Sequence, residues 1–364
     1  MYCRDVGLRF IGLWLVAMLL GCEPTAQERA NTVEILSQGA QIENQGFAAV
    51  VPGKTWQFPQ DHLSHPAFKT EWWYLTANLT SPEGKTFGVQ WTLFRFASRR
   101  TSEVGWHSPQ MYMAHAVVTG EKQLWHAERF ARGGIGQAGV AGDPFRAWLD
   151  NWSWRSESSH PFPGMLTFAD ENMVATLKVE NQGELIFQGE NGYSRKHPTE
   201  DIASYYYSAP FLQLSGTLVL DGQPYQVSGP GWLDREWSSE GLAKSQLGWD
   251  WFSLHLDDGS ALMLYQIREK DSVPYYFGSR SWPDGRAVML SPDDIRMTPI
   301  ANARHEGKLY PVQWQVAVPS QNIQLKVDVV RKEQWLPFIF SYWEGPVWVS
   351  GSHTGQGFME LTGY

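Results

Sequence analysis

From residue 47 to the C-terminus, the chain consists of short apolar and aromatic runs separated by Gly, Pro, Asn and Asp residues. Several runs alternate apolar and polar residues, and no long stretch has the 3.6-residue period of an amphipathic helix. Sequences typical of hairpin turns join some of them, at residues 81–85, 220–223 and 257–260. The pattern therefore predicts an all-β fold of antiparallel strands. The clearest runs are residues 73–79, 87–96, 111–119, 174–179, 212–220, 251–256, 261–267, 312–318, 323–330 and 347–350.

Two segments that lie 177 residues apart resemble each other. Residues 71–79 read EWWYLTANL and residues 248–256 read GWDWFSLHL, and each is followed by a Gly turn and an apolar strand that ends in Arg. A long internal repeat indicates a duplicated domain, and closing each sheet into a barrel would remove its exposed edges. We expect two antiparallel β-barrels in tandem, residues 47–236 and 237–364. Chance similarity in a chain with 19 Trp residues is the alternative.

Residues 1–21 have the features of a bacterial lipoprotein signal peptide: early Arg residues, a short apolar run and a final Leu-Leu-Gly before Cys22. The run is shorter than the about 20 residues that span a bilayer, which disfavours an uncleaved membrane anchor. Cys22 is then the lipidated first residue that attaches the protein to the membrane, and polar residues 22–46 are a flexible tether. Glu23 favours the outer membrane of a Gram-negative cell envelope, facing the periplasm.

The composition argues against several function classes. With 29 basic and 38 acidic residues, the net charge of −9 disfavours a nucleic-acid partner bound through phosphates. Cys3 and Cys22 are the two Cys residues, so no disulfide framework is expected. The motifs of serine hydrolases, zinc proteases and P-loop proteins are missing. Asp61, His62 and His65 match a weak metal-binding pattern that a solvated loop explains better. We expect no cofactor and no metal.

The densest group of polar residues lies in residues 229–239, GPGWLDREWSS. On an extended strand, Asp234 and Glu236 share one face, and Arg235 and Trp237 share the other. A carboxyl group among aromatic side chains can have a raised pKa and act as a general acid. The favoured alternative is an ion pair between Arg235 and one of the carboxylates that joins the two barrels.

Aromatic and Met side chains line several other strand faces. In residues 111–115, Met113 and His115 share a face with Met111, and Trp249 shares a face with Trp251. Flat aromatic rings and flexible Met side chains suit an elongated apolar ligand. An ordinary barrel core is the alternative for each single residue. The candidate ligand-binding residues are Trp72, Trp73, Met113, His115, Tyr206, Arg235, Trp237, Trp249 and Trp251.

Taken in order, these motifs resemble the AttH-like/carotenoid 1,2-hydratase lipocalin family. The resemblance runs from about residue 47 to the C-terminus and rests on the lipobox, EWWYLTANL, MYMAHAVVTG, YYYSAPFLQLSGTL, GWLDREWSS, GWDWFSLHLDDGSALMLYQIR and GFMELTGY. It implies two lipocalin-like (calycin) barrels and a role in binding or transforming a hydrophobic, isoprenoid-like molecule. The hydratases of this family protonate a carbon–carbon double bond and add water without a cofactor.

The hydratase pattern carries over only in part. Asp234, Trp237 and Tyr265 match it. The candidate catalytic residues are Asp234 and Tyr265, together with Glu236, which shares the strand face of Asp234. Arg235 stands where the hydratases have His, and its pKa is too high for proton transfer near neutral pH. The acid that follows the Tyr in the hydratases is replaced by Gln266 and Ile267. Carotenoid hydration itself is therefore disfavoured.

The leading hypothesis is a lipid-anchored envelope protein that binds or carries a hydrophobic, lipid or isoprenoid-like ligand. One alternative is a cofactor-independent hydratase or hydrolase, with Asp234 or Glu236 as acid and base and with His115 or Tyr265 assisting. Another is a non-catalytic subunit of an envelope transport complex. The expected partners are a hydrophobic small molecule and the membrane, which the protein reaches through Cys22.

Overall fold

The computed structural model describes residues 46–100 and 103–364. The signal peptide, the lipidated Cys22 and almost all of the tether proposed from the sequence lie outside these residues. Within the described part, none of the helices has the length and apolar character needed to cross a membrane. These helices are 3-10 turns of three residues each: η1 (Gln60–His62), η2 (Gly105–His107), η3 (Pro292–Asp294) and η4 (Pro319–Gln321).

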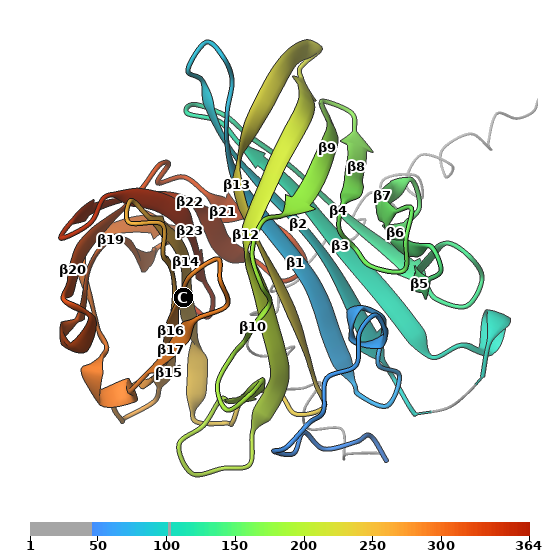
Figure 1. The fold of residues 1–364 in the computed structure, drawn as a ribbon, viewed down its shortest axis with the longest axis horizontal. Coiled ribbons are helices and arrows are strands. Elements are labelled where there is room, and N and C mark those ends of the chain that lie inside the picture. The colour runs from blue at the N-terminus through green and yellow to red at the C-terminus, as the bar shows by residue number, and fades with distance from the viewer. Residues whose placement is uncertain (1–45, 101–102) are drawn as a thin grey trace, which may run out of the picture.

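The first half of the chain forms a 13-stranded antiparallel sheet. It curls so that its distant strands face a shared interior (Figure 1). Its strands are β1 (Thr70–Thr80), β2 (Thr86–Ala97), β3 (Gln110–Thr119), β4 (Leu124–Arg132), β5 (Ala138–Gly142), β6 (Phe145–Leu149), β7 (Trp152–Ser156), β8 (Gly164–Asp170), β9 (Met173–Asn181), β10 (Ile186–Phe187), β11 (Tyr193–Arg195), β12 (Ala203–Leu220) and β13 (Gln223–Ser238).

The second half forms a 10-stranded antiparallel sheet. Figure 1 shows this sheet, in orange and red, as a nearly closed barrel beside the first. Its strands are β14 (Gln246–Leu256), β15 (Ala261–Glu269), β16 (Tyr275–Ser281), β17 (Ala287–Leu290), β18 (Arg296–His305), β19 (Lys308–Val318), β20 (Ile323–Val329), β21 (Trp335–Leu336), β22 (Tyr342–Gly351) and β23 (Gly355–Leu361). The predicted all-β, antiparallel, barrel-type fold is confirmed.

The two sheets have the same strand order. The first runs β4-β3-β2-β1-β13-β12-β9-β8-β7 before its last two strands, and the second runs β17-β16-β15-β14-β23-β22-β20-β19-β18. The two segments that resemble each other in the sequence therefore form β1 and β14, which occupy equivalent places. Each forms a hairpin with the next strand and also pairs with the last strand of its own sheet.

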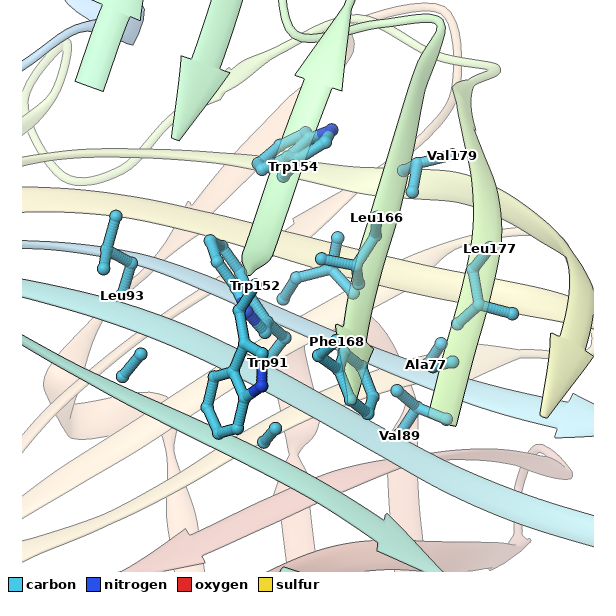
Figure 2. Close-up of a cluster of buried hydrophobic side chains, with 14 of the residues drawn as sticks. Ala77, Val89, Trp91, Leu93, Trp152, Trp154, Leu166, Phe168, Leu177 and Val179 are labelled. Atoms are coloured by element: carbon cyan, nitrogen blue, oxygen red, sulfur yellow. The ribbon is translucent and has the colours of Figure 1, made fainter. Parts of the chain in front are cut away.

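Each sheet encloses its own apolar core. In the first, the large cluster brings Trp91 of β2 against Trp152 and Trp154 of β7, as Figure 2 shows. The ring centroids of Trp91 and Trp154 are 6.4 Å apart in an edge-to-face arrangement, the preferred geometry for aromatic pairs. The second core is built around Trp314 and Trp343. Because strand residues alternate between faces, this inward-facing set leaves the intervening residues on the outer face of each sheet.

A third cluster joins the outer faces of the two sheets. Tyr74 of β1, Tyr206 of β12 and Trp232 of β13 belong to it, together with Trp251 and Tyr265 of the second sheet. We call this region the junction. Both sheets contribute apolar side chains to the junction, so they pack together as one unit. Polar groups within the junction are therefore buried.

Candidate functional site

Four carboxyl groups lie at the junction: Asp234, Glu236, Glu344 and Glu360. We call them the carboxyl cluster. Asp234 and Glu236 come from β13 of the first sheet, and Glu344 and Glu360 come from β22 and β23 of the second. Asp234 and Glu360 occupy related places in their sheets. Asp234 is opposite Ser208 on β12, and Glu360 is opposite Glu344 on β22.

The strands that carry Asp234 and Glu360 share a local sequence. Residues 229–234 read GPGWLD and residues 355–360 read GQGFME. A Cβ atom on Gly229 would lie 2.0 Å from the carbonyl oxygen of Asn78, and one on Gly355 would lie 2.1 Å from that of His255. Glycine is needed at both positions because the neighbouring strand approaches so closely. The repeated motif therefore places an acidic side chain at the same point of each sheet.

Asp234 is surrounded by neutral hydrogen-bond donors. Its Oδ1 accepts from Ser208 Oγ at 2.5 Å and from Trp232 Nε1 at 2.8 Å, and its Oδ2 accepts from Tyr206 Oη at 2.8 Å. Burial raises the pKa of Asp234 to about 7, against the lowering effect of these hydrogen bonds, and the charge of Glu236 raises it further. A carboxyl group with a pKa near 7 can give up or take a proton under physiological conditions.

Glu236 is the member of the cluster that has a cationic partner. Its Oε1 lies 2.6 Å from Nζ of Lys196, which follows β11, and accepts a hydrogen bond from Ser204. The same Lys196 ammonium lies 5.0 Å from the ring centroid of Tyr206 and 4.9 Å from that of Tyr265. Lys196 thus holds two aromatic rings and a carboxylate together at one edge of the cluster.

Glu344 and Glu360 face each other on neighbouring strands. Burial and the charge of Glu360 raise the pKa of Glu344 well above its usual value, although Tyr74 donates a hydrogen bond to Oε1 of Glu344. Burial raises the pKa of Glu360 to about 7 as well; a hydrogen bond with Trp249 lowers it, and the charges of Glu236 and Asp234 raise it.

Like charges this close cannot all be present without cation partners. Lys196 balances Glu236, whereas the raised pKa values let Asp234 and Glu360 exchange protons near pH 7 and let Glu344 keep its proton. Protons in such a group belong to the interacting set rather than to one residue. The carboxyl cluster is therefore a small store of exchangeable protons inside an apolar junction.

Aromatic side chains border the cluster where it approaches solvent. Trp72, Trp249 and Glu360 are half-buried, whereas Tyr74 and Trp251 are buried and pack edge to face with ring centroids 5.3 Å apart. An apolar molecule could replace water at the half-buried rings without disturbing the buried ones. Of the residues predicted to bind ligand or to act in catalysis, those at the junction are Trp72, Tyr206, Asp234, Glu236, Trp249, Trp251 and Tyr265.

Trp73, Arg235 and Trp237 lie on the opposite, inner face of the first sheet. The Arg235 guanidinium lies 3.8 Å from the Trp73 ring centroid, and its Nη2 is 3.1 Å from Oε2 of Glu71. Trp237 stacks on His65 with ring centroids 3.8 Å apart. The predicted division of residues 234–237 between two faces is therefore confirmed. The ion pair suggested between Arg235 and Asp234 or Glu236 is wrong, because the strand alternation turns Arg235 away from both.

Met113 and His115 lie at a third place, on β3 of the first sheet. His115 Nδ1 is 2.8 Å from Oη of Tyr342 on β22, and its ring packs against Phe338, which lies between β21 and β22. Met113 is buried on the same strand face, opposite Phe94 of β2. His115 thus contacts the second sheet through side chains other than those around Asp234.

The solvated loop suggested for Asp61, His62 and His65 is wrong. Asp61 and His62 are buried, and His65 lies 3.0 Å from Glu71 Oε2 and 3.1 Å from Asp61 Oδ1. These contacts tie the segment before β1 to the inner face of the first sheet, together with a 2.7 Å contact between His62 Nδ1 and Tyr207 Oη. No group of three or more His, Cys, Asp or Glu side chains suited to a metal ion occurs among the described residues.

Sequence reasoning missed half of the carboxyl cluster. Glu344 lies outside the strands predicted from the sequence, and Glu360 appears there only within the GFMELTGY motif of the resemblance. The signal was available in the repeated GPGWLD and GQGFME motifs, which align Asp234 with Glu360. Tyr74, Lys196, Ser204 and Ser208 were also missed, and no sequence pattern sets them apart from other strand residues.

Comparisons with known proteins place the fold. A family model described as AttH-like matches residues 49–364. A crystal structure of an AttH-type protein from Nitrosomonas europaea is 36% identical, with a TM-score of 0.78 over 87% of this chain and 99% of that chain. Kievitone hydratase from Nectria haematococca is 14% identical, with a TM-score of 0.63 over 88% of this chain and 96% of its own. The structure of CghA with Sch210972 is 12% identical, with a TM-score of 0.54 over 88% and 97%. No protein with a curated description matches the chain.

Proposed function

Because the chain belongs to the AttH-like family, we propose that it binds a hydrophobic small molecule at the junction between its two sheets. The observation that carries the proposal is the set of half-buried aromatic side chains, Trp72 and Trp249 above all, beside a fully buried aromatic cluster. Half-buried indole rings leave apolar surface in water, and covering that surface with a ligand releases about 25 cal/mol for each Å².

The binding proposal is tested with protein purified from its own membranes. An organic-solvent extract is examined by mass spectrometry, with a mock preparation from cells that lack the protein as control. We expect an apolar compound in stoichiometric amount, reduced about tenfold in Trp72→Ala or Trp249→Ala, since each truncation removes a large contact. Trp148→Ala is the matched variant, because Trp148 is also half-buried but lies on β6, outside the junction cluster. Protein that carries and binds no apolar compound would instead favour a non-catalytic subunit of an envelope transport complex.

Asp234 favours a second, enzymatic function: acid–base addition or removal of water on the bound molecule. In the addition, protonated Asp234 gives its proton to one carbon of a double bond, and a water oxygen bonds to the other carbon. The water proton then passes to an ionised carboxylate, for which Glu360 is the candidate. Gln266 and Ile267 stand directly after Tyr265, where the hydratases have an acid. In this proposal Glu360, from another strand, takes the place of that second acid. The hydratase activity in the name of the kievitone enzyme is consistent with this chemistry, although its low identity carries only the fold.

The enzymatic proposal is tested with the extracted compound in water enriched in oxygen-18. A hydratase gives a product that is heavier by one labelled water, and the reverse reaction removes it. Asp234→Asn keeps the acceptors for Ser208 and Trp232 but removes the titrating proton, and we expect the rate to fall by about a factor of 100 or more. Unchanged turnover in this variant would rule out Asp234 as the acid, and retained binding would leave the first proposal intact.

The proposed location is the bacterial cell envelope, through a lipid on Cys22. The support is the sequence of residues 1–22 and the stable anchoring that several acyl chains on one residue provide. Incorporation of labelled palmitate into the wild-type protein is expected, with loss of label and of membrane association in Cys22→Ser. Label that persists in Cys22→Ser would contradict the anchor.

A further inference from the structure

Glu344 is the most deeply buried member of the carboxyl cluster, with 1% of its surface exposed. Three titratable groups face it: Tyr74 from β1, Tyr342 from β22 and Glu360 from β23. Glu360 is half-buried and is one route by which Glu344 could exchange a proton with water. If a ligand occupies the junction as proposed above, it covers that route, because Glu360 lies beside Trp249.

A second polar path leads from Glu344 through the β3 side of the molecule. Tyr342 interacts with the Glu344 carboxyl, and Tyr342 Oη lies 2.8 Å from His115 Nδ1. His115 Nε2 lies 3.1 Å from Glu128 Oε1, and the Glu128 side chain is 17% exposed. Tyr342 and His115 are both buried, so the path reaches water at Glu128.

The donors and acceptors along this path fit a single direction. Glu128 also accepts from the backbone N–H of Ile339, which marks it as an acceptor, so His115 Nε2 carries a proton. Burial lowers the pKa of His115, and the nearby Glu128 raises it. Neutral His115 with a proton on Nε2 must accept at Nδ1, and Tyr342 therefore donates to it. The Tyr342 oxygen accepts from Gln90 Nε2 at 2.8 Å and also interacts with the Glu344 carboxyl, so it can accept the proton of protonated Glu344.

We propose that Tyr342, His115 and Glu128 form a proton relay that exchanges protons between Glu344 and solvent. Protonated Glu344 gives its proton to the Tyr342 oxygen, and Tyr342 gives its own proton to His115 Nδ1. His115 then holds protons on both nitrogens and gives the one on Nε2 to Glu128, which releases it to water. One proton has left Glu344, one has reached water, and His115 now carries its proton on Nδ1. The same steps in reverse, starting from this form, return a proton from water to Glu344.

The relay belongs to only one half of the duplicated structure. On the register of the two sheets, Thr92 and His115 of β2 and β3 correspond to Tyr265 and Phe277 of β15 and β16. Phe277 cannot carry a proton. The path therefore leads only to the Glu344–Glu360 pair of the second sheet. Among the described residues, Glu344 has no cationic partner like the Lys196 that pairs with Glu236. The relay rests on the proposed function for its purpose, which is to exchange protons with Glu344 while a ligand covers the route through Glu360. Proton transfer along the relay itself requires no ligand.

The test follows the infrared C=O band of protonated Glu344 after transfer from H2O to D2O. It uses a Glu360→Gln background to close the other route, and Glu344→Gln in that background assigns the band. We expect Glu128→Gln and His115→Asn to slow the isotope shift of this band by about one to two orders of magnitude. His126→Asn is the matched control, because His126 packs against the same Phe338 ring, with centroids 5.6 Å apart, and lies outside the path.

Each outcome decides the relay independently of ligand binding. A Glu344 band that shifts equally fast in Glu128→Gln and in its background would overturn the relay, as would the absence of any Glu344 band at neutral pH. Glu128 is partly exposed, so its variant tests the relay even where the buried His115→Asn does not fold. A slow shift in Glu128→Gln together with a failure to find any apolar ligand would sustain the relay and reject the proposed function.

Discussion

In the first sheet, Asp234 faces Ser208 across β12 and β13; in the second, Glu360 faces Glu344 at the corresponding position of β22 and β23. Asp234 has three neutral donors around it, and its neighbour Glu236 has a cation, Lys196. The second pair instead places two carboxyl groups directly opposite each other, an arrangement that disfavours two negative charges.

This difference shows how a duplicated fold acquires unlike halves. The backbone requirement is common to both, since the Gly-x-Gly segments within β13 and β23 each let a neighbouring strand approach closely. The chemistry depends on single side chains, such as Ser208 in one copy and Glu344 in the other. Asp234 and Glu360 are therefore both suited to titrate near neutral pH, whereas Glu344, directly opposite Glu360, is suited to keep a proton.

The largest expected effect concerns the pH dependence of Asp234. Its pKa is about 7 in the folded protein and 3.8 ordinarily. Its contribution to the free energy of unfolding is therefore fully present below pH 3.8 and is lost as the pH rises through 7, by up to about 4 kcal/mol. Asp234→Asn is expected to flatten this decline, measured by denaturant unfolding between pH 4 and pH 8. An unchanged slope would show that Asp234 titrates normally in the folded state.

The next effect concerns the cation of the first half. Lys196→Met leaves Glu236 buried beside the other carboxyl groups and is expected to cost about 3 kcal/mol at neutral pH. Adding Glu236→Gln to this variant should recover most of the loss, because the uncompensated charge is then removed. Lys178→Met is the comparison, since the Lys178–Glu180 pair is exposed and such pairs contribute about 0.5 kcal/mol or less. Equal losses in the two Lys variants would mean that Lys196 has no special role.

The smallest effect compares one tyrosine from each half. Tyr206 donates to Asp234 and Tyr74 donates to Glu344. Tyr206→Phe is expected to cost about 1 kcal/mol at pH 5 and about 2 kcal/mol at pH 8.5, because hydrogen bonds to an ionised acceptor are stronger. Tyr74→Phe should cost about 1 kcal/mol at both pH values, since Glu344 stays protonated. A pH-dependent loss in Tyr74→Phe would show that the two halves do not differ as described.

Local patterns in the sequence predicted much of this architecture. The alternation of residues assigned Asp234 and Glu236 to one strand face and Arg235 and Trp237 to the other. The resemblance between residues 71–79 and 248–256 matches the equivalent places of β1 and β14. Aromatic side chains were harder to assign: Trp72 faces the junction, whereas Trp73 packs inside the first sheet. A local sequence does not say which face of a strand is the core when both faces are apolar.

The sequence by itself determined the two-residue alternation, the glycine-dependent turns and the repeated strand pattern, because each depends on backbone geometry over a few residues. Only the tertiary structure decided that the outer faces of the two sheets meet and that Glu344 and Glu360 come close to Asp234 and Glu236. Those side chains are separated by more than a hundred residues along the chain. Their raised pKa values arise from burial and from mutual repulsion, which exist only once the sheets have packed together.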